Sequence, residues 1–388
     1  MDFQLTPEQE ELRKKAKEFA EKEILPYLSK WIADRCVPRE VDRKLAEWGI
    51  AGRTYPVKYG GQGRPFTDAM IVSETLSRVG AGAAIRSIFY GELGPMRTIA
   101  FCGTEEQKAK YIPMICKGEL RTSFGMTEPD AGTALTDLKT RAVEDGESYI
   151  LNGHKNFVIG AGDSDLYLVY VKYNDIPGSK GIGAVLVEKG TPGMVFQVDR
   201  SKEFMGMNIP PQGDIFFHDC RVPKKNVLVK AGEFGTLMAG DGFHRIGNAI
   251  ACLGHAEWAL DLATKWSLER KQFGKPICDF QAIQLKLADM AIWVEAMRAL
   301  VYSATTTAEK GAPNVLLGSI AKAFADETVR SVVSNAVQIY GGYGYSCEYP
   351  LESLLRETWG FGIGGGTIDI LKVRIASELL NRKFDQRK

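Results

Sequence analysis

Leu166-Tyr-Leu-Val-Tyr-Val-Lys-Tyr173 is the stretch that decides the fold, because its β-branched and aromatic residues favour a strand. Similar short runs follow it, and Gly, Pro, Asn and Asp separate them. No long helix interrupts the series, so a small antiparallel barrel or sandwich is expected rather than βαβ units. The further runs are 183–187, 194–198 and 214–217.

Helical patterns lie on both sides of this region. Thr6-Pro7-Glu8-Gln9 is a helix start signal, with Thr6 as the cap and Gln9 completing a capping box. After about residue 231, long helical patterns return at 236–271, 280–310, 314–338 and 366–382. The predicted fold class is α+β multidomain. Its parts are an N-terminal α-helical domain (1–120), a middle antiparallel β-barrel or sandwich (121–230) and a C-terminal four-helix bundle (231–388).

Composition excludes several classes of protein. The 388 residues carry a net charge of +1, which favours neither a nucleic-acid partner nor an acidic membrane surface. Membrane spans, a secretory signal and metal-binding Cys/His spacings are not expected, and the seven scattered cysteines are typical of free thiols in a reducing cytoplasm. Without a GxGxxG fingerprint or a P-loop, a nicotinamide dehydrogenase or an ATPase is disfavoured.

Five segments stand out in order along nearly the whole chain. They are Met126-Thr-Glu-Pro-Asp-Ala-Gly-Thr133, Leu151-Asn-Gly-His-Lys155, Glu269-Arg-Lys-Gln-Phe-Gly-Lys-Pro276 with Phe280-Gln281, Gln338-Ile-Tyr-Gly-Gly-Tyr-Gly-Tyr345, and Glu348-Tyr-Pro350. Together they resemble motifs of the acyl-CoA dehydrogenase family of FAD enzymes. One such motif would be weak, but five on a helix–β–helix layout are specific.

The resemblance implies that FAD is held jointly by two subunits of a homotetramer, a dimer of dimers. Thr127 would hydrogen-bond the pyrimidine side of the flavin, and the planar guanidinium of Arg270 suits a pyrophosphate. Thr127 could instead be an ordinary turn residue at the end of a strand, and Arg270 a solvated charge on a helix. The joint occurrence of the motifs favours cofactor binding. The positions assigned to FAD are Met126, Thr127, Thr133, Phe157, Ile159, Arg270, Phe273, Gln281, Gln338, Gly342, Thr367 and Asp369.

The proton acceptor of the family is missing from its usual positions. The family's reaction removes a proton next to the thioester carbonyl while a hydride leaves the following carbon for flavin N5. The usual acceptor is a Glu two residues before the Thr that matches Thr367, and that position is Gly365. Some members place the Glu before an Arg in the first bundle helix, and here His244 precedes Arg245.

Two further departures concern the ligands. Near the flavin the family has an aromatic residue and then a Thr, which here look like Phe157 and Ile159; Ile159 would otherwise be ordinary strand core. Gly365 either disables the enzyme or makes room for a bulky or branched acyl group. The intact motifs favour room for the acyl group, with Tyr90, Arg245 and Gly365 contacting substrate, so that Gly365→Glu would install ordinary dehydrogenation.

Three residues are candidates for catalysis. Glu92 follows the segment that resembles the floor of the acyl pocket and is the leading proton acceptor, although it could equally be a solvated loop acid. His244 is the second, with a structural role beside Arg245 as its alternative. Arg86 could bind an anionic group at the far end of a substrate, or form a surface ion pair.

Three functions follow from these patterns. The preferred one is an FAD-dependent acyl-CoA dehydrogenase with a displaced base, acting on an unusual, possibly alicyclic, acyl-CoA and passing electrons to an electron-transfer flavoprotein. The alternative is a redox-neutral lyase that expels sulfinate or CO2 from a substrate held by Arg86. The third is a non-catalytic acyl-CoA- or flavin-binding relative. Substrate consumption and the need for an electron acceptor distinguish them.

Overall fold

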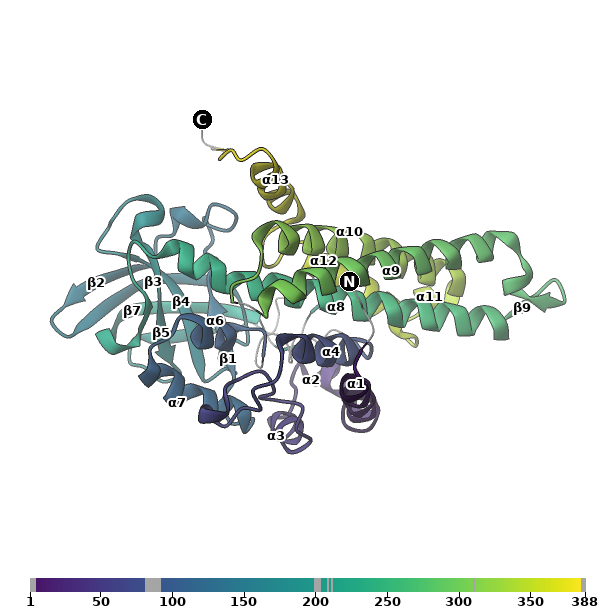
Figure 1. The fold of residues 1–388 in the computed structure, drawn as a ribbon, viewed down its shortest axis with the longest axis horizontal. Helices are drawn as coiled ribbons and strands as arrows, with labels where there is room; N and C mark the ends of the chain where they lie inside the picture. The colour runs from purple at the N-terminus through teal and green to yellow at the C-terminus, as the bar shows by residue number, and fades with distance from the viewer. Residues whose placement is uncertain are drawn as a thin grey trace.

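A computed structural model of the chain describes residues 5–80, 92–198, 204–207, 209–210, 212–309 and 311–384. Helices, then strands, then long helices follow one another along these residues. Figure 1 shows the sheet at one end of an elongated molecule, the long helices running from it to the other end, and the N-terminal helices packed where the two meet. The predicted fold class is confirmed.

The middle of the chain forms an eight-stranded sheet in the order β6-β7-β3-β2-β4-β5-β8, with β1 beside β4. Its pairs are antiparallel except that β1 and β2 run parallel to β4. The strands are β1 (Thr122–Gly125), β2 (Arg141–Asp145), β3 (Ser148–Ile159), β4 (Leu166–Tyr173), β5 (Ile182–Glu188), β6 (Met194–Gln197), β7 (Gln212–Pro223) and β8 (Val227–Val229).

Strand β4 is buried on both faces, which explains its nearly continuous apolar sequence. Leu168 and Tyr170 join a core shared with the N-terminal helices, whereas Val169 and Val171 join the core inside the sheet domain. The alternation follows from the two-residue period of a strand. Residues on the face of Tyr170 therefore lie where all three parts of the molecule come together.

The N-terminal helices are short and irregular. The predicted capping box is present: Thr6 Oγ1 accepts a hydrogen bond from the Gln9 backbone N–H (3.3 Å), and Gln9 Oε1 accepts one from the Thr6 N–H (3.1 Å). The helices are α1 (Pro7–Phe19), α2 (Leu28–Asp34), α3 (Glu40–Glu47), α4 (Phe66–Ser77), α6 (Pro95–Cys102) and α7 (Glu105–Cys116).

The C-terminal bundle contains α8 (Phe234–Glu269), α9 (Gln281–Ala308), α10 (Val315–Tyr340) and α12 (Pro350–Phe361). The first three were predicted to within a few residues. The predicted helix at 366–382 is α13 (Ile368–Leu379), which buries Leu371 alone among its residues and projects from the bundle (Figure 1). Instead α12, which the sequence analysis did not predict, packs Leu351, Leu354 and Phe361 into the bundle core.

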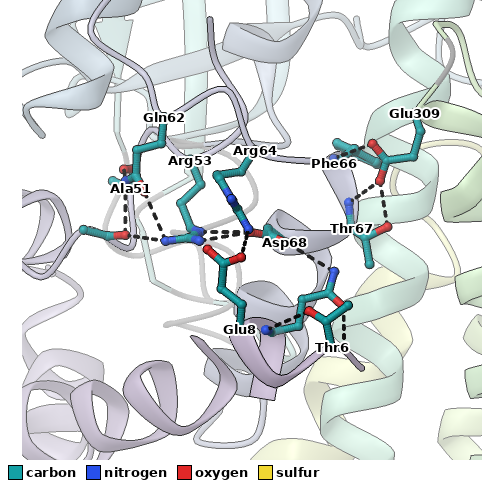
Figure 2. Close-up of polar contacts among 12 residues, drawn as sticks. Thr6, Glu8, Ala51, Arg53, Gln62, Arg64, Phe66, Thr67, Asp68 and Glu309 are labelled. Atoms are coloured by element: carbon teal, nitrogen blue, oxygen red, sulfur yellow. Dashed lines mark hydrogen bonds and ion pairs between the residues drawn. The ribbon is translucent and has the colours of Figure 1, made fainter. Parts of the chain in front are cut away.

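Helix α4 is fastened to the bundle and to α1 by the polar contacts in Figure 2. Glu309, just after α9, accepts hydrogen bonds from the backbone N–H groups of Phe66 and Thr67, both at 2.7 Å, and thereby caps the start of α4. Asp68 Oδ2 accepts from Arg53 Nη2 (3.0 Å) and Arg64 Nε (3.4 Å). Through Glu309, these contacts hold the start of α4 against the end of α9.

Within the described ranges, every helix is too short or too polar to cross a membrane.

Candidate active site

The end of β1 and a bulge in β3 bring the first set of predicted flavin residues together. The pairing of β3 with β7 shifts register between Lys155 and Val158. Phe157 lies in this bulge with φ 56° and is 57% exposed. The adjacent Asn156 N–H donates to the Thr127 carbonyl oxygen (2.8 Å). The bulge therefore aims an aromatic ring outward beside Thr127, as expected where a strand is adapted to a ligand.

A buried ion pair supports this turn from below. Lys155 is fully buried, and its Nζ donates to Glu128 Oε1 (2.8 Å) and to the Met126 carbonyl oxygen (3.2 Å). Burial would raise the pKa of Glu128, but Lys155 and the N–H groups of Lys139 and Thr140 outweigh burial and lower it. The charged pair thus fixes the backbone on either side of Thr127.

Among the residues that the structure describes, no hydrogen bond links Thr127 to Ile159 or Thr133, the other two residues of this domain that are predicted to bind FAD. Ile159 is half-buried, and its carbonyl oxygen accepts a hydrogen bond from Ser123 Oγ (2.6 Å). Thr133 is exposed on the loop after β1. Both roles stay predictions.

One face of α8 carries four polar residues at positions i, i+3, i+4 and i+7: Asp241, His244, Arg245 and Asn248. The His244 ring lies edge-on to Phe124 of β1, with ring centroids 5.4 Å apart. A Cβ built on Gly365 would lie 2.7 Å from Asn248 Nδ2 and 3.2 Å from His244 Nδ1. The side of Gly365 where the family's carboxylate would begin is therefore filled by α8.

The segment around Gly365 is tied to the core by one lysine. Lys322 on α10 is fully buried, forms an ion pair with Asp326, and donates to the carbonyl oxygens of Phe361 (3.0 Å) and Gly366 (3.2 Å). Beyond it, Thr367 Oγ1 accepts the Ile370 N–H (3.3 Å) and caps α13. The glycine segment thus has a defined path between α12 and α13.

His244 is held neutral by its surroundings. Burial, with smaller effects of Lys322 and Arg245, lowers its pKa from 6.5 to about 3. As pH falls through 6.5, the unfolded chain binds a proton that the folded chain rejects, so stability is lost down to about pH 3. We expect His244→Gln to flatten this acid loss, measured as urea midpoints at pH 7 and pH 5. Equal losses in both proteins would contradict it.

Glu92 lies on the side of α8 that faces the N-terminal helices. Its Oε2 accepts hydrogen bonds from Thr54 Oγ1 and from Arg97 Nη2 (3.3 Å), and the Arg97 guanidinium lies 5.7 Å from the ring centroid of Phe243. Its Oε1 is buried and accepts no hydrogen bond from the residues placed in the structure. Glu92 stays a candidate proton acceptor, with one of its oxygens already engaged. Arg86 and Tyr90 lie outside the described residues.

Two further predicted FAD residues, Arg270 and Gly342, line a pocket of about 490 Å³ at the far end of the bundle. Arg270 ends α8, and its guanidinium lies 5.4 Å from the ring centroid of Tyr343. Trp266 stacks on Tyr340 with centroids 4.5 Å apart, and its Nε1–H has no acceptor within the described chain. Gly342 also lines the pocket, and a Cβ there would meet open space.

The remaining predicted residues lie nearby or apart. Phe273 is 94% exposed in the hairpin of β9 (Lys271–Gln272) and β10 (Lys275–Pro276), beside Phe280 and the start of α9 at Gln281. Gln338 is exposed on the last turn of α10, before α11 (Gly342–Tyr345). Asp369 is exposed in the first turn of α13.

The chemistry of both sets fits parts of FAD. The exposed Phe157 beside Thr127 offers a surface for a planar ring system, and the distal pocket combines a guanidinium for phosphate with aromatic faces for a base. Arg270, directly before β9, lies at the end of the bundle away from the sheet, whereas Thr127 follows β1 in the sheet domain (Figure 1).

Sequence reasoning missed Asp241, Asn248, Lys322 and Asp326. The first two had a usable signal, since they share the helical spacing of His244 and Arg245. Lys322 and Asp326 are four residues apart on α10, and this spacing is also typical of ion pairs on an exposed helix surface. Only burial shows that they are structural.

Comparisons with known proteins agree with this architecture. Sequence models of the acyl-CoA dehydrogenase N-terminal, middle and C-terminal domains match residues 6–119, 123–220 and 234–380. The acryloyl-CoA reductase (NADH) of Anaerotignum propionicum is 39% identical over 386 residues, covering 98% of this chain and 97% of that protein. The cyclohex-1-ene-1-carbonyl-CoA dehydrogenase of Syntrophus aciditrophicus is 36% identical over 380 residues, covering 97% and 91%.

Among solved structures, butyryl-CoA dehydrogenase from Megasphaera elsdenii superposes with a TM-score of 0.93 at 36% identity, covering 98% of this chain and 100% of that one. All three parts of the fold are therefore shared in order. The chain belongs to the acyl-CoA dehydrogenase family, the FAD-dependent oxidoreductases that act on CH–CH bonds of CoA thioesters.

Proposed function

We propose that this chain desaturates an acyl-CoA with a proton acceptor that has moved from the family's usual position. The observation that carries the proposal is Gly365, whose side-chain direction is filled by His244 and Asn248 rather than by a carboxylate. Buried lysines hold the backbone at both predicted sites: Lys322 binds the carbonyl oxygen of Gly366, and Lys155 with Glu128 holds the turn at Thr127.

The chain's own residues divide the work as follows. When bound, FAD accepts the hydride from the carbon β to the thioester carbonyl. Thr127 and Phe157 would orient the flavin at the bulge in β3, and the polar face of α8 would border the acyl group opposite them. Burial of that face excludes water from the reacting carbons, which strengthens every polar contact made there.

The acyl group is proposed from the relatives. One relative is named for a cyclohexenyl thioester and another for reduction of acryloyl-CoA. Gly365 adds no argument for a bulky acyl group, because His244 and Asn248 fill the direction in which a side chain at this position would point. We propose an alicyclic or branched acyl-CoA, with either direction of hydrogen transfer open to the same site.

An anaerobic titration tests the function directly. The protein, loaded with FAD, is mixed with butyryl-CoA, isobutyryl-CoA, cyclohexanecarbonyl-CoA and a sulfinated and a carboxylated acyl-CoA in turn, while flavin absorbance is followed and products are weighed by mass spectrometry. Bleaching with loss of two hydrogens from the substrate is expected. Release of sulfinate or CO2 with the flavin still oxidised would establish the lyase instead, and no consumption of any thioester would contradict both.

The electrons must then leave the protein, and we propose an electron-transfer flavoprotein as the acceptor. Reoxidation by such a protein, but not by buffer alone, is the expected result in the same cuvette. A cytoplasmic location is part of the proposal, since the seven cysteines are all free.

We also propose a homotetramer in which each FAD bridges two chains. Arg270→Met is expected to weaken FAD binding about 10–100-fold, because a charge-assisted contact to pyrophosphate is lost while the aliphatic stem is kept. Retained flavin after gel filtration measures this, and ultracentrifugation gives the subunit number. Arg221→Met, at an exposed ion pair with Asp145 in the sheet domain, is the control. Full FAD retention in Arg270→Met would contradict the shared site.

A further inference from the structure

Buried carboxylates are the natural place to look for the displaced proton acceptor. Nearly all of those in the described chain are committed to a cation or to several hydrogen bonds. Asp68 binds Arg53, Glu74 binds Arg298, Glu128 binds Lys155, and Asp326 binds Lys322. Buried carboxylate oxygens that accept no hydrogen bond from a described residue occur in two side chains, Glu92 and Asp241.

Asp241 is the less constrained of the two. Glu92 has its second oxygen held by Thr54 and Arg97. Asp241 is 5% exposed, its Oδ1 is without a donor among the placed residues, and its nearest cation is Arg245 Nη2 at 3.8 Å from Oδ2. That distance exceeds a hydrogen bond. A carboxylate buried in this state calls for a ligand or a role.

Two more polar atoms near Asp241 are in the same condition. Tyr170 on β4 is fully buried, and neither its hydroxyl nor Arg245 Nε has a partner within the described part of the chain. The charge of Asp241 adds to burial in raising the pKa of Tyr170, as expected of close neighbours. Asp241 Oδ1, Arg245 Nε and the Tyr170 hydroxyl are thus three buried polar groups with unmet hydrogen bonds in one region, on the Tyr170 face that all three parts of the molecule share.

The position of this cluster relates it to the reacting site. Asp241 lies one turn of α8 before His244 and on the same face, and His244 contacts both Phe124 of β1 and the Gly365 position. Strand β1 leads directly into Met126 and Thr127. Asp241 therefore borders the space between α8 and the flavin-binding edge of the sheet.

Resting on the proposed dehydrogenase function, we propose that Asp241 is the displaced catalytic base. Its carboxylate takes the proton from the carbon α to the thioester carbonyl while the hydride from the β carbon passes to FAD. The substrate gains one carbon–carbon double bond, Asp241 becomes a neutral carboxylic acid, and the flavin is reduced by two electrons. Tyr170 and Arg245 would position the carboxylate.

The electrostatic setting agrees with this role. Burial raises the pKa of Asp241, while Arg245 on its own helix and Lys322 on α10 act to lower it. The ionisable group facing it from β4 is Tyr170. A carboxylate whose proton affinity is increased by burial is a better base than one in water.

The test compares Asp241→Asn with Asp261→Asn, a substitution of an exposed carboxylate on the same helix. With the acyl-CoA that bleaches the wild-type flavin, Asp241→Asn is expected to reduce FAD about 10²–10⁴-fold more slowly while retaining FAD. Asp261→Asn should behave as wild type. Wild-type reduction in Asp241→Asn, or loss of reduction in Glu92→Gln with Asp241→Asn still active, would overturn the proposal.

Chemical rescue separates catalysis from a structural role. In Asp241→Ala, added formate is expected to restore flavin reduction and the exchange of the substrate's α-proton with D2O, because a free carboxylate can occupy the vacated space. If formate restores neither flavin reduction nor α-proton exchange, Asp241 is not the base. This result decides the question even if Asp241→Asn has lost its FAD. If the wild-type protein itself bleaches with no thioester and exchanges no proton, the proposed function fails rather than the assignment of the base.

Discussion

Lys322→Met is expected to lower the free energy of unfolding by about 3–5 kcal/mol, because it leaves the buried Asp326 carboxylate without its cation. Burial already raises the pKa of Asp326 to about 6 despite Lys322. Without the lysine the carboxyl would take up a proton to stay buried, which limits the loss. Urea unfolding of the FAD-saturated protein, followed by tryptophan fluorescence, measures the change.

The double substitution Lys322→Met with Asp326→Leu is the matched control. Replacing both members of a buried pair by apolar groups is often neutral, so stability should return to within about 1–2 kcal/mol of wild type. Flavin reduction should stay impaired, because the carbonyl oxygens of Phe361 and Gly366 have lost their donor. Wild-type turnover in the double variant would mean that the hydrogen bonds from Lys322 to the glycine segment have no part in the reaction.

Gly365→Glu is expected to lower the free energy of unfolding by about 2–5 kcal/mol and to add no dehydrogenation of straight-chain acyl-CoAs beyond that of the wild type. Gly365 has φ +69°, where any other residue loses about 1–2 kcal/mol. The new Cβ would lie 2.7 Å from Asn248 Nδ2, and overpacking of a buried site costs about 1–3 kcal/mol more. The sequence alone predicted a gain of ordinary activity, and the geometry argues against it.

Asn248→Ala is the partner substitution that tests this account. Combined with Gly365→Glu, Asn248→Ala should restore the part of the unfolding free energy that is lost to steric overlap. It should not restore the part that is lost to the positive φ. Thermal unfolding of the two single variants and the double variant gives the coupling. If butyryl-CoA bleaches the flavin in Gly365→Glu alone, at unchanged stability, the side chains of α8 beside Gly365 can move aside, and the steric account is wrong.

The catalytic candidates show how far local patterns reach. Glu92 is predicted from the segment it follows, but one of its carboxylate oxygens accepts hydrogen bonds from Thr54, which is distant along the chain, and from the nearby Arg97. The family pattern covers only the residue immediately before Arg245, so it does not point to Asp241. A helix places residues i and i+3 on one face, so Asp241, one turn before His244, lies on the same face of α8.

By itself the sequence determined the order of helical and β regions, the start of α1, the family motifs and the absence of a carboxylate at positions 244 and 365. These follow from periodicity and residue identity, which are local properties. The tertiary structure alone decided that α12 rather than α13 fills the bundle, that Lys322 holds the glycine segment, and that Asp241 is buried without a donor among the described residues. Burial and pairing depend on residues distant along the chain, whose meeting no local pattern encodes.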